Sequence, residues 1–175
     1  MLGSLFLQVA SRLQQQRGDC VFIIPAANDQ RKQQIQDQLQ TFGGGIDVQL
    51  LDGQSHQVMA AADAILLASG TTALEAMLFK KPMVVAYKMA PLSFAIISRL
   101  VKAKYVSLPN LLADKAIVPE LLQHDATVEA LSEQMHDILA EAGQRQVQQF
   151  YTLHKQLQQD ASQTAARAVL ELING

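Results

Sequence analysis

The sequence predicts an α/β fold with a doubly wound parallel sheet, followed by helices alone. Three features of the 175 residues predict it: short apolar runs alternate with amphipathic segments, glycine, proline and asparagine punctuate the boundaries, and only helical periodicity follows Asp125. Repeated β–α units pack as parallel strands with helices on both faces of the sheet. We therefore expect an α/β domain over residues 1–125 and a C-terminal helical extension over residues 126–175.

An amphipathic helix is predicted over residues 2–16, because apolar side chains recur there at helical spacing and Gly18 follows as a C-terminal cap. The apolar run 20–25 predicts the first strand. Asn28 can cap the polar helix that comes next, and a run of glycines ends that helix. Residues 46–51 form the second predicted strand, which establishes the β–α alternation.

The alternation continues as far as Asp125. The further predicted elements are a short helix near 54–61, a strand over 63–67, a helix to Phe79, a strand over 83–87 and a helix over 91–102. Two helical segments follow, at 127–142 and at 144–173. The second is rich in glutamine, but an apolar stripe indicates a helix, continuous or broken, rather than a disordered tract.

Residues 69–72, here called the phosphate turn, connect a buried strand to a helix. Ser69 can cap the new helix, and Gly70 lets a ligand approach the backbone closely. Thr71 and Thr72 add hydroxyl groups beside amides whose dipole favours an anion. Glu75, one helical turn later, would repel phosphate but can accept two hydrogen bonds from a ribose diol. The pattern suits a nucleoside diphosphate; an ordinary capped turn with a carboxylate that complements the helix dipole is the alternative.

Composition excludes several classes of function. A formal net charge of −2 gives no general attraction to nucleic acid. The single cysteine, Cys20, starts an apolar run and is expected to be a buried strand residue, and no apolar stretch is long enough to span a bilayer. The histidines show no metal-ligand spacing and are expected on the surface, so we expect neither a metal nor a cofactor.

Basic residues gather in one interval of the chain. No acidic residue lies between Glu75 and Asp114, and the cations there are Lys80, Lys81, Lys88, Arg99, Lys102 and Lys104. Apolar residues 89–97 lie among them. Interleaved apolar and cationic groups suit an enzyme that handles anionic lipids at a membrane surface; a core helix with a solvated basic end is the alternative.

Three motifs, in this order, resemble the lipid-A-disaccharide synthases, which are two-domain glycosyltransferases of the GT-B type. They are Ser-Gly-Thr-Thr in the phosphate turn, Lys-Lys-Pro-Met-Val-Val-Ala-Tyr-Lys-Met at 80–89 and Tyr-Val-Ser-Leu-Pro-Asn-Leu-Leu-Ala at 105–113. The resemblance covers essentially the whole chain, and Ser-Leu-Pro-Asn-Leu-Leu is its most specific part. It implies that residues 1–125 are the Rossmann-like, nucleotide-sugar-binding domain, and that the helical extension packs on this domain or on a missing partner.

The resemblance also implies a reaction. It is the transfer of 2,3-diacylglucosamine from UDP-2,3-diacylglucosamine to a lipid monosaccharide phosphate, lipid X, with release of UDP. The general base would come from an N-terminal domain and not from this chain. The implied partners are these two substrates, that domain and an anionic membrane surface, with a homodimer as a further option. The implied location is cytoplasmic and peripheral on the inner membrane.

Binding roles follow from the same resemblance. It places the uracil beside Asp52 and Gly53, the ribose on Glu75 and the diphosphate on the phosphate turn, residues 69–72. Asp-Gly is also a common tight-turn pair, and that alternative stays open.

Four further residues are candidates for contacts with substrate. Asn110 is expected to make polar contacts with donor or acceptor, and a structural cap of the following short helix is the alternative. Lys88 and Arg99 are candidates for phosphate contacts, and Tyr87 for stacking on a sugar. Solvated surface or simple packing is the alternative for these three.

The order of elements predicts a defect in the sheet. The first predicted element is a helix, whereas a complete domain of this family begins with a strand and a glycine-rich, arginine-containing turn. In the strand order 3-2-1-4-5-6 that strand is central, so two inner strands would lack a partner unless they close up or another segment fills the gap. We expect a fragment of a longer protein. A non-catalytic nucleotide-sugar-binding module and another UDP-sugar GT-B enzyme are the alternative functions.

Overall fold

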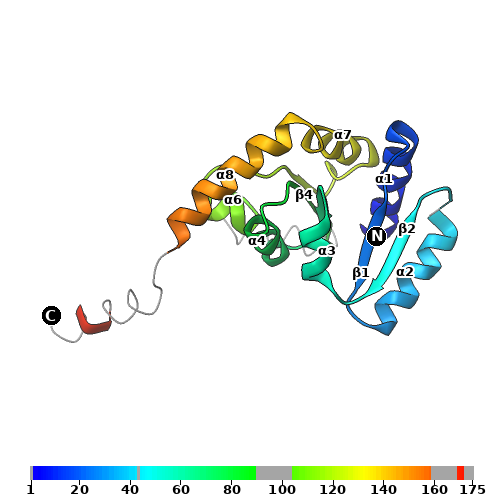
Figure 1. Ribbon diagram of the computed structural model, residues 1–175, viewed down its shortest axis with the longest axis horizontal. Helices are drawn as coiled ribbons and strands as arrows, with labels where there is room; N and C mark the ends of the chain where they lie inside the picture. The colour runs from blue at the N-terminus through cyan, green and yellow to red at the C-terminus, as the bar shows by residue number, and fades with distance from the viewer. Residues whose placement is uncertain (1, 43, 90–103, 159–168, 172–175) are drawn as a thin grey trace.

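The computed structural model describes residues 2–42, 44–89, 104–158 and 169–171 (Figure 1). Its helices are α1 (Leu2–Arg17), α2 (Asp29–Phe42), α3 (Ser55–Ala61), α4 (Gly70–Leu78), α6 (Leu108–Ala113), α7 (Val128–Ile138) and α8 (Glu141–Leu157). Its strands are β1 (Phe22–Ala26), β2 (Val48–Asp52), β3 (Ile65–Leu67), β4 (Met83–Tyr87) and β5 (Glu120–Leu122). The predicted helix over 91–102 lies outside the described residues, as does much of the chain after 158.

The predicted α/β fold is confirmed, because every strand pair in the described residues is parallel. Phe22 faces Val48 in the β1–β2 pair, and Ile65 faces Met83 in the β3–β4 pair. Most element boundaries lie within a few residues of their predicted positions. Strand β5 was not predicted, since three residues are too short to show a periodic pattern.

Strand β4 shows why the fold is doubly wound. Its side chains alternate between two hydrophobic cores on opposite faces of the sheet. Met83 and Val85 pack with residues of α3, α4 and α8, whereas Val84 and Ala86 pack with residues of α1 and α7. All four are fully buried. A strand covered on both faces is expected to be a continuous apolar run, which is how β4 reads in the sequence.

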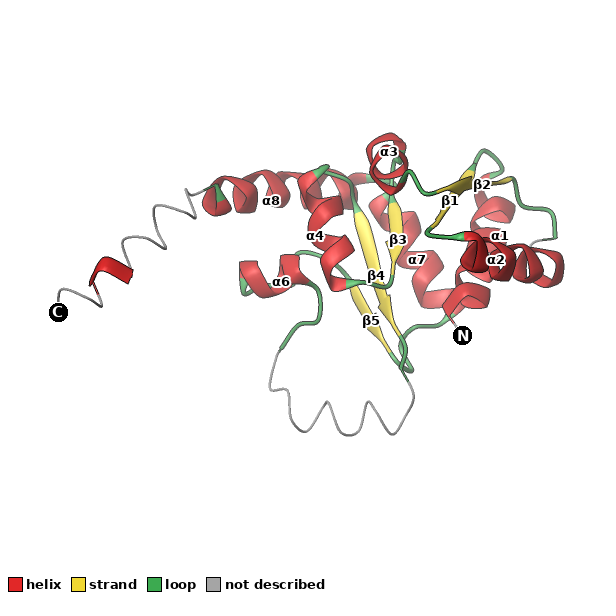
Figure 2. Ribbon diagram, turned by 90° about the horizontal axis from the view of Figure 1, so that it is seen from below, coloured by secondary structure: helices red, strands yellow, loops and turns green. Residues whose placement is uncertain are grey.

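The strands form two sheets where we expected one. Strand β1 pairs with β2, and the second sheet has the order β3-β4-β5, so β1 and β3 each pair on one side only within the described residues. Figure 2 shows β3, β4 and β5 along their length but β1 and β2 foreshortened, so the two sheets do not share a strand direction. The break between the two sheets lies between β1 and β3. In the order 3-2-1-4-5-6, this is the position of the first strand. The two inner strands therefore stay apart instead of closing up.

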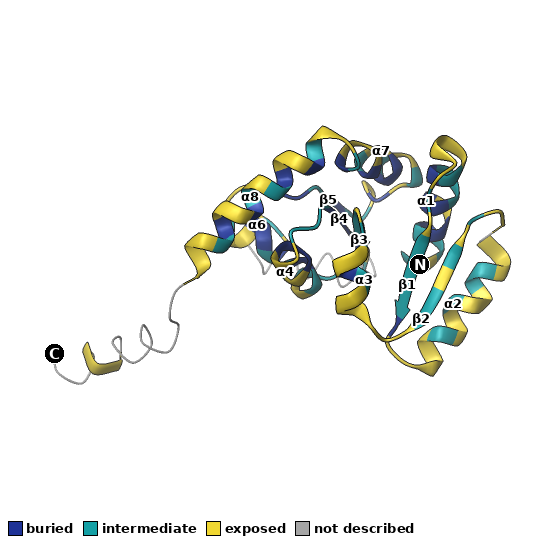
Figure 3. Ribbon diagram, in the orientation of Figure 1, coloured by how far each residue is buried: buried dark blue, intermediate teal, exposed yellow. Residues whose placement is uncertain are grey.

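The two sheets differ in burial (Figure 3). Strand β4 is buried at all positions before Tyr87, whereas β1 is buried only at Ala26 and α2 has no buried residue. Less apolar area is therefore removed from water around β1, α2 and β2. This unit should open more readily than the body around β4.

Helix α8 packs against the sheet around β4. Phe150 is fully buried in the same core as Met83. Gln146 accepts a hydrogen bond from the Met83 N–H at 2.6 Å and donates one to the Met83 carbonyl at 3.1 Å, so a side chain replaces a neighbouring strand at this point.

Among the described residues, no helix combines the length and apolarity needed to cross a bilayer.

Candidate functional site

The phosphate turn, residues 69–72, connects β3 to α4. The predicted cap is confirmed: Ser69 has an extended backbone, and its hydroxyl accepts a hydrogen bond from the Thr72 N–H at 3.3 Å. The hydroxyl oxygens of Ser69 and Thr71 lie 3.0 Å apart and share a hydrogen bond. The first amides of a helix have no acceptor within the helix, so the N–H groups of Gly70 and Thr71 and one of these two hydroxyl hydrogens can be donated to an anion.

Gly70 contacts a second segment of backbone. A Cβ atom added to Gly70 would lie 3.1 Å from the Val106 carbonyl oxygen and 4.0 Å from the Ser107 Cα. Gly70 is not among the glycines with positive φ, so the close contact, and not backbone strain, calls for glycine here. Residues 106–108 therefore form one side of the phosphate turn.

Asn110, in the first turn of α6, is only 1% exposed. Its side-chain oxygen accepts hydrogen bonds from the N–H groups of Ile117 and Val118, both at 2.8 Å. Its amide group donates to the Val118 carbonyl at 2.8 Å and to Glu120 Oε1 at 2.7 Å. These bonds use both donors and both acceptor positions within the protein. The N-cap of α6 is Ser107, so Asn110 is not the helix cap that we weighed; its contact with substrate stays a prediction.

Glu75 lies on the exposed side of α4, and its side chain is 47% exposed. One carboxylate oxygen lies 3.5 Å from His56 Nε2, which comes from α3. His56 is largely exposed, as expected of a surface histidine, and its ring also lies 5.7 Å from that of Phe79. The Glu75 carboxylate is therefore accessible to a ligand and has a polar neighbour that the sequence did not indicate.

Asp52 is the last residue of β2, and the chain bends at Gly53. Gly53 has φ of +64° and donates its N–H to the Ala26 carbonyl at 2.8 Å. The Asp52 carboxylate is exposed and accepts a hydrogen bond from Lys32 Nζ at 2.7 Å. A uracil contact at this turn stays a prediction.

Tyr87 and Lys88 lie at the carboxyl end of β4, the first half-buried and the second exposed. Gln123, at the end of β5, donates its N–H to the Tyr87 carbonyl at 2.7 Å. The Gln123 side chain accepts from the Met89 N–H at 2.8 Å and donates to the Met89 carbonyl at 3.3 Å. Gln123 therefore fixes the backbone on both sides of Lys88. Arg99 lies outside the described residues.

Two lysines of the basic interval have shifted pKa values. Burial lowers the pKa of Lys80, whose ammonium lies 2.7 Å from His154 Nδ1 and 3.1 Å from the Leu78 carbonyl. Its hydrogen bond to Tyr105 raises the pKa of Lys104, which lies 5.2 Å from the centre of that ring. Lys104 is exposed and charged at neutral pH, whereas Lys80 belongs to the contact between α4 and α8.

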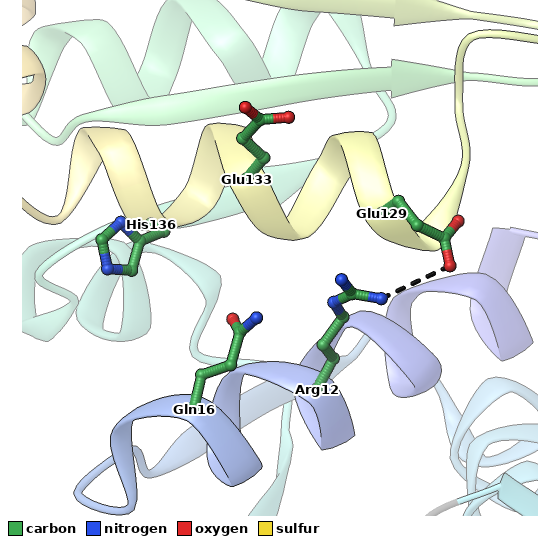
Figure 4. A pocket seen from close by; sticks show the side chains of 5 residues that line it. All are labelled: Arg12, Gln16, Glu129, Glu133 and His136. Atoms are coloured by element: carbon green, nitrogen blue, oxygen red, sulfur yellow. Dashed lines mark hydrogen bonds and ion pairs between the residues drawn. The ribbon is translucent and has the colours of Figure 1, made fainter.

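A separate pocket of about 470 Å³ lies between α1 and α7 (Figure 4). Its lining residues are Arg12, Gln16, Glu129, Glu133 and His136. Arg12 and Glu129 form an ion pair of 3.4 Å across it. None of the predicted site residues lines this pocket. Within the described residues, no cluster of three or more histidine, cysteine, aspartate or glutamate side chains could hold a metal ion.

The predicted site residues form two groups, one on each sheet. The phosphate turn follows β3, and Tyr87 and Lys88 lie at the carboxyl end of β4, while Asp52 and Gly53 lie at the carboxyl end of β2. Helix α3 starts shortly after Gly53, and the contact of its His56 with Glu75 connects the two groups.

Two polar residues near these groups, Glu120 and Gln123, were not predicted. No local motif marks either residue, because their partners are distant in the chain.

Comparisons with known proteins agree with one another. A family model described as lipid-A-disaccharide synthetase matches residues 1–173. A protein named lipid-A-disaccharide synthase from Hahella chejuensis is 56% identical over 173 residues, which cover 98% of this chain and 44% of the relative. Relatives of the same name from Pseudomonas putida and Pseudomonas fluorescens are 53% and 52% identical over 172 residues, which cover 98% of this chain and 45% of each relative. The chain therefore spans less than half the length of these curated relatives.

Proposed function

Because the chain belongs to the lipid-A-disaccharide synthetase family, we propose that it forms the donor-binding part of a glycosyltransferase of lipid A biosynthesis. The reaction would transfer 2,3-diacylglucosamine from its UDP carrier to lipid X and release UDP. One observation carries the proposal: the phosphate turn follows the carboxyl end of β3, where open α/β sheets bind nucleotides. The family match over nearly the whole chain favours this function over a non-catalytic module or another UDP-sugar enzyme.

In this proposal the phosphate turn binds the diphosphate of the donor. The N–H groups of Gly70 and Thr71, at the start of α4, donate hydrogen bonds to it, together with the one hydroxyl hydrogen that the Ser69–Thr71 hydrogen bond leaves available. Negative charge grows on the leaving phosphate as the bond to the sugar breaks, and donors already in place stabilise that charge. Glu75 accepts hydrogen bonds from the ribose, and the turn at Asp52 and Gly53 contacts the uracil.

The remaining roles concern the sugar and the acceptor. Lys88 and Arg99 contact phosphate, Tyr87 packs on a sugar, and Asn110 contacts donor or acceptor. The acceptor hydroxyl loses a proton as the new bond forms, and we assign the base to a domain outside this chain. A second copy of the protein is a further partner that the resemblance implies.

Replacing Glu75 with alanine in a full-length synthase that contains this chain tests the ribose contact. UDP affinity is expected to fall by about 1 to 3 kcal/mol, because two hydrogen bonds to a charged acceptor are lost. Titration calorimetry measures the affinity. Glu141→Ala is the matched control, since Glu141 is an exposed residue of α8 whose carboxylate lies 3.5 Å from Arg145. Unchanged UDP affinity in Glu75→Ala would refute the ribose role.

We also propose that the basic interval contacts an anionic membrane at its cytoplasmic face. Neutralising Lys102 and Lys104 should weaken binding of the full-length protein to anionic vesicles by up to about 1 kcal/mol per charge at low salt. Added salt should have the same effect, because it screens exposed charges. Lys115→Gln removes an exposed cation outside the interval and is the control. Vesicle sedimentation that responds neither to salt nor to these charges would leave the interval as ordinary surface.

A further inference from the structure

The Glu120 carboxylate, at the first residue of β5, accepts four hydrogen bonds from a segment that precedes it in the chain. Its Oε1 accepts the Ser107 N–H at 2.8 Å, the Ser107 hydroxyl at 2.6 Å and the Asn110 amide at 2.7 Å. Its Oε2 accepts the Val106 N–H at 2.9 Å. Two of the four donors are backbone groups, so the carboxylate fixes the path of the main chain itself.

The main chain that Glu120 holds is the segment that touches the phosphate turn. The Val106 carbonyl lies 3.1 Å from the position of a Cβ on Gly70, and the Leu108 nitrogen lies 3.9 Å from it. The Val106 N–H therefore donates to Glu120, while the Val106 carbonyl lies beside Gly70. Since packed backbone has little free space, a shift of Val106 changes the position available to the start of α4.

Glu120 is itself held in place. Its backbone pairs with Val85 of the buried strand β4, and Ser107 is fully buried beside it. A chain of contacts thus runs from β4 through Glu120 and residues 106–108 to Gly70.

From this geometry we propose that Glu120 is a positioning residue that fixes the phosphate turn for the donor diphosphate. This inference rests on the proposed function, and Glu120 acts through residues 106–108 without touching the donor. A carboxylate is required because both its oxygens accept backbone N–H groups. Glutamine would turn an NH₂ group toward one of these donors and break that hydrogen bond.

The test compares UDP with uridine, which lacks the diphosphate, by titration calorimetry on the full-length protein. In Glu120→Gln, UDP affinity is expected to fall about tenfold because the diphosphate donors are misplaced, while uridine affinity stays unchanged. Glu120→Asp keeps two acceptor oxygens on a shorter side chain and should lose less. Glu141→Gln removes an exposed carboxylate of α8 and should change neither affinity.

Unchanged UDP affinity in Glu120→Gln would overturn the inference. So would equal losses for UDP and uridine, because they would indicate a general structural defect. If the wild-type protein binds neither UDP nor uridine, the proposed function is refuted. Amide hydrogen exchange, which needs no ligand, then tests whether Glu120 positions the phosphate turn. Glu120→Gln must accelerate exchange at Thr72 and Ala73 more than in α7; unchanged protection there would exclude positioning by Glu120.

Discussion

Purified residues 1–175 alone are expected to form no lipid disaccharide from UDP-2,3-diacylglucosamine and lipid X. In the proposed reaction this chain supplies only the donor side, whereas transfer needs an acceptor and a general base held against the donor. Such positioning supplies roughly 7 to 11 kcal/mol of the barrier reduction, so its loss abolishes measurable turnover. Chromatography of radiolabelled product measures the reaction.

The division of the strands into two sheets should also impair the isolated chain. Strands β1 and β3 pair on one side only in the described part of the chain, and open strand edges template association between copies. The isolated chain should therefore self-associate and bind UDP weakly at best. Light scattering and calorimetry test these two points.

Supplying the portion of a relative that this chain does not match is the control. Fusion or co-expression with the part of the Hahella chejuensis relative that this chain does not match should restore solubility and disaccharide formation. The same pairing with Glu75→Ala should be impaired in UDP binding. Robust synthase activity from residues 1–175 alone would contradict the two-domain proposal and the assignment of the base outside this chain.

Replacing Asn110 with alanine is expected to lower the free energy of unfolding by about 3 kcal/mol. The substitution leaves the N–H groups of Ile117 and Val118 without their acceptor in a buried site. It also removes a donor from Glu120. Urea denaturation of the full-length protein, followed by circular dichroism, measures the change.

Asn110→Asp sharpens this test because it keeps the shape of the side chain. A carboxylate would then face Glu120 where the amide now donates at 2.7 Å. The free energy of unfolding should therefore fall further at neutral pH than in Asn110→Ala. This loss of stability should become smaller as the pH falls, because the two carboxyl groups can then share a proton and form a hydrogen bond instead of repelling each other.

Asn28→Ala is the control for these variants. It removes an exposed helix cap, whose oxygen accepts the Arg31 N–H at 2.9 Å, and should cost only about 1 kcal/mol. Wild-type stability of Asn110→Ala together with lost activity would instead support direct contact between Asn110 and substrate.

Features that depend on near neighbours in the chain could be predicted from the sequence. The run Met-Val-Val-Ala-Tyr identifies β4 because a strand covered on both faces needs apolar side chains on both. Ser69 and Asn28 are recognisable caps because each acceptor lies three positions before the amide that it binds.

Features that depend on distant partners could not be predicted. Glu120 and Gln146 are polar residues in unremarkable surroundings, and only the fold brings them to the backbone of Val106 and Met83. Asn110 stands in a specific motif, but nothing in that motif indicates its four hydrogen bonds to Ile117, Val118 and Glu120. The division into two sheets likewise depends on which strands meet, and not on any strand's own pattern.

The contact between α8 and β4 has a consequence for folding during synthesis. Gln146 and Phe150 complete one side of β4, but Gln146 is 63 positions after Met83. At about 5–20 residues per second, a ribosome needs roughly 3 to 13 s to add that length. Throughout this interval the core around Met83 and Val85 has the residues of α3 and α4, which are made earlier, but lacks Phe150 and Leu153 of α8. Newly made chains should therefore depend on chaperones most strongly just before α8 emerges.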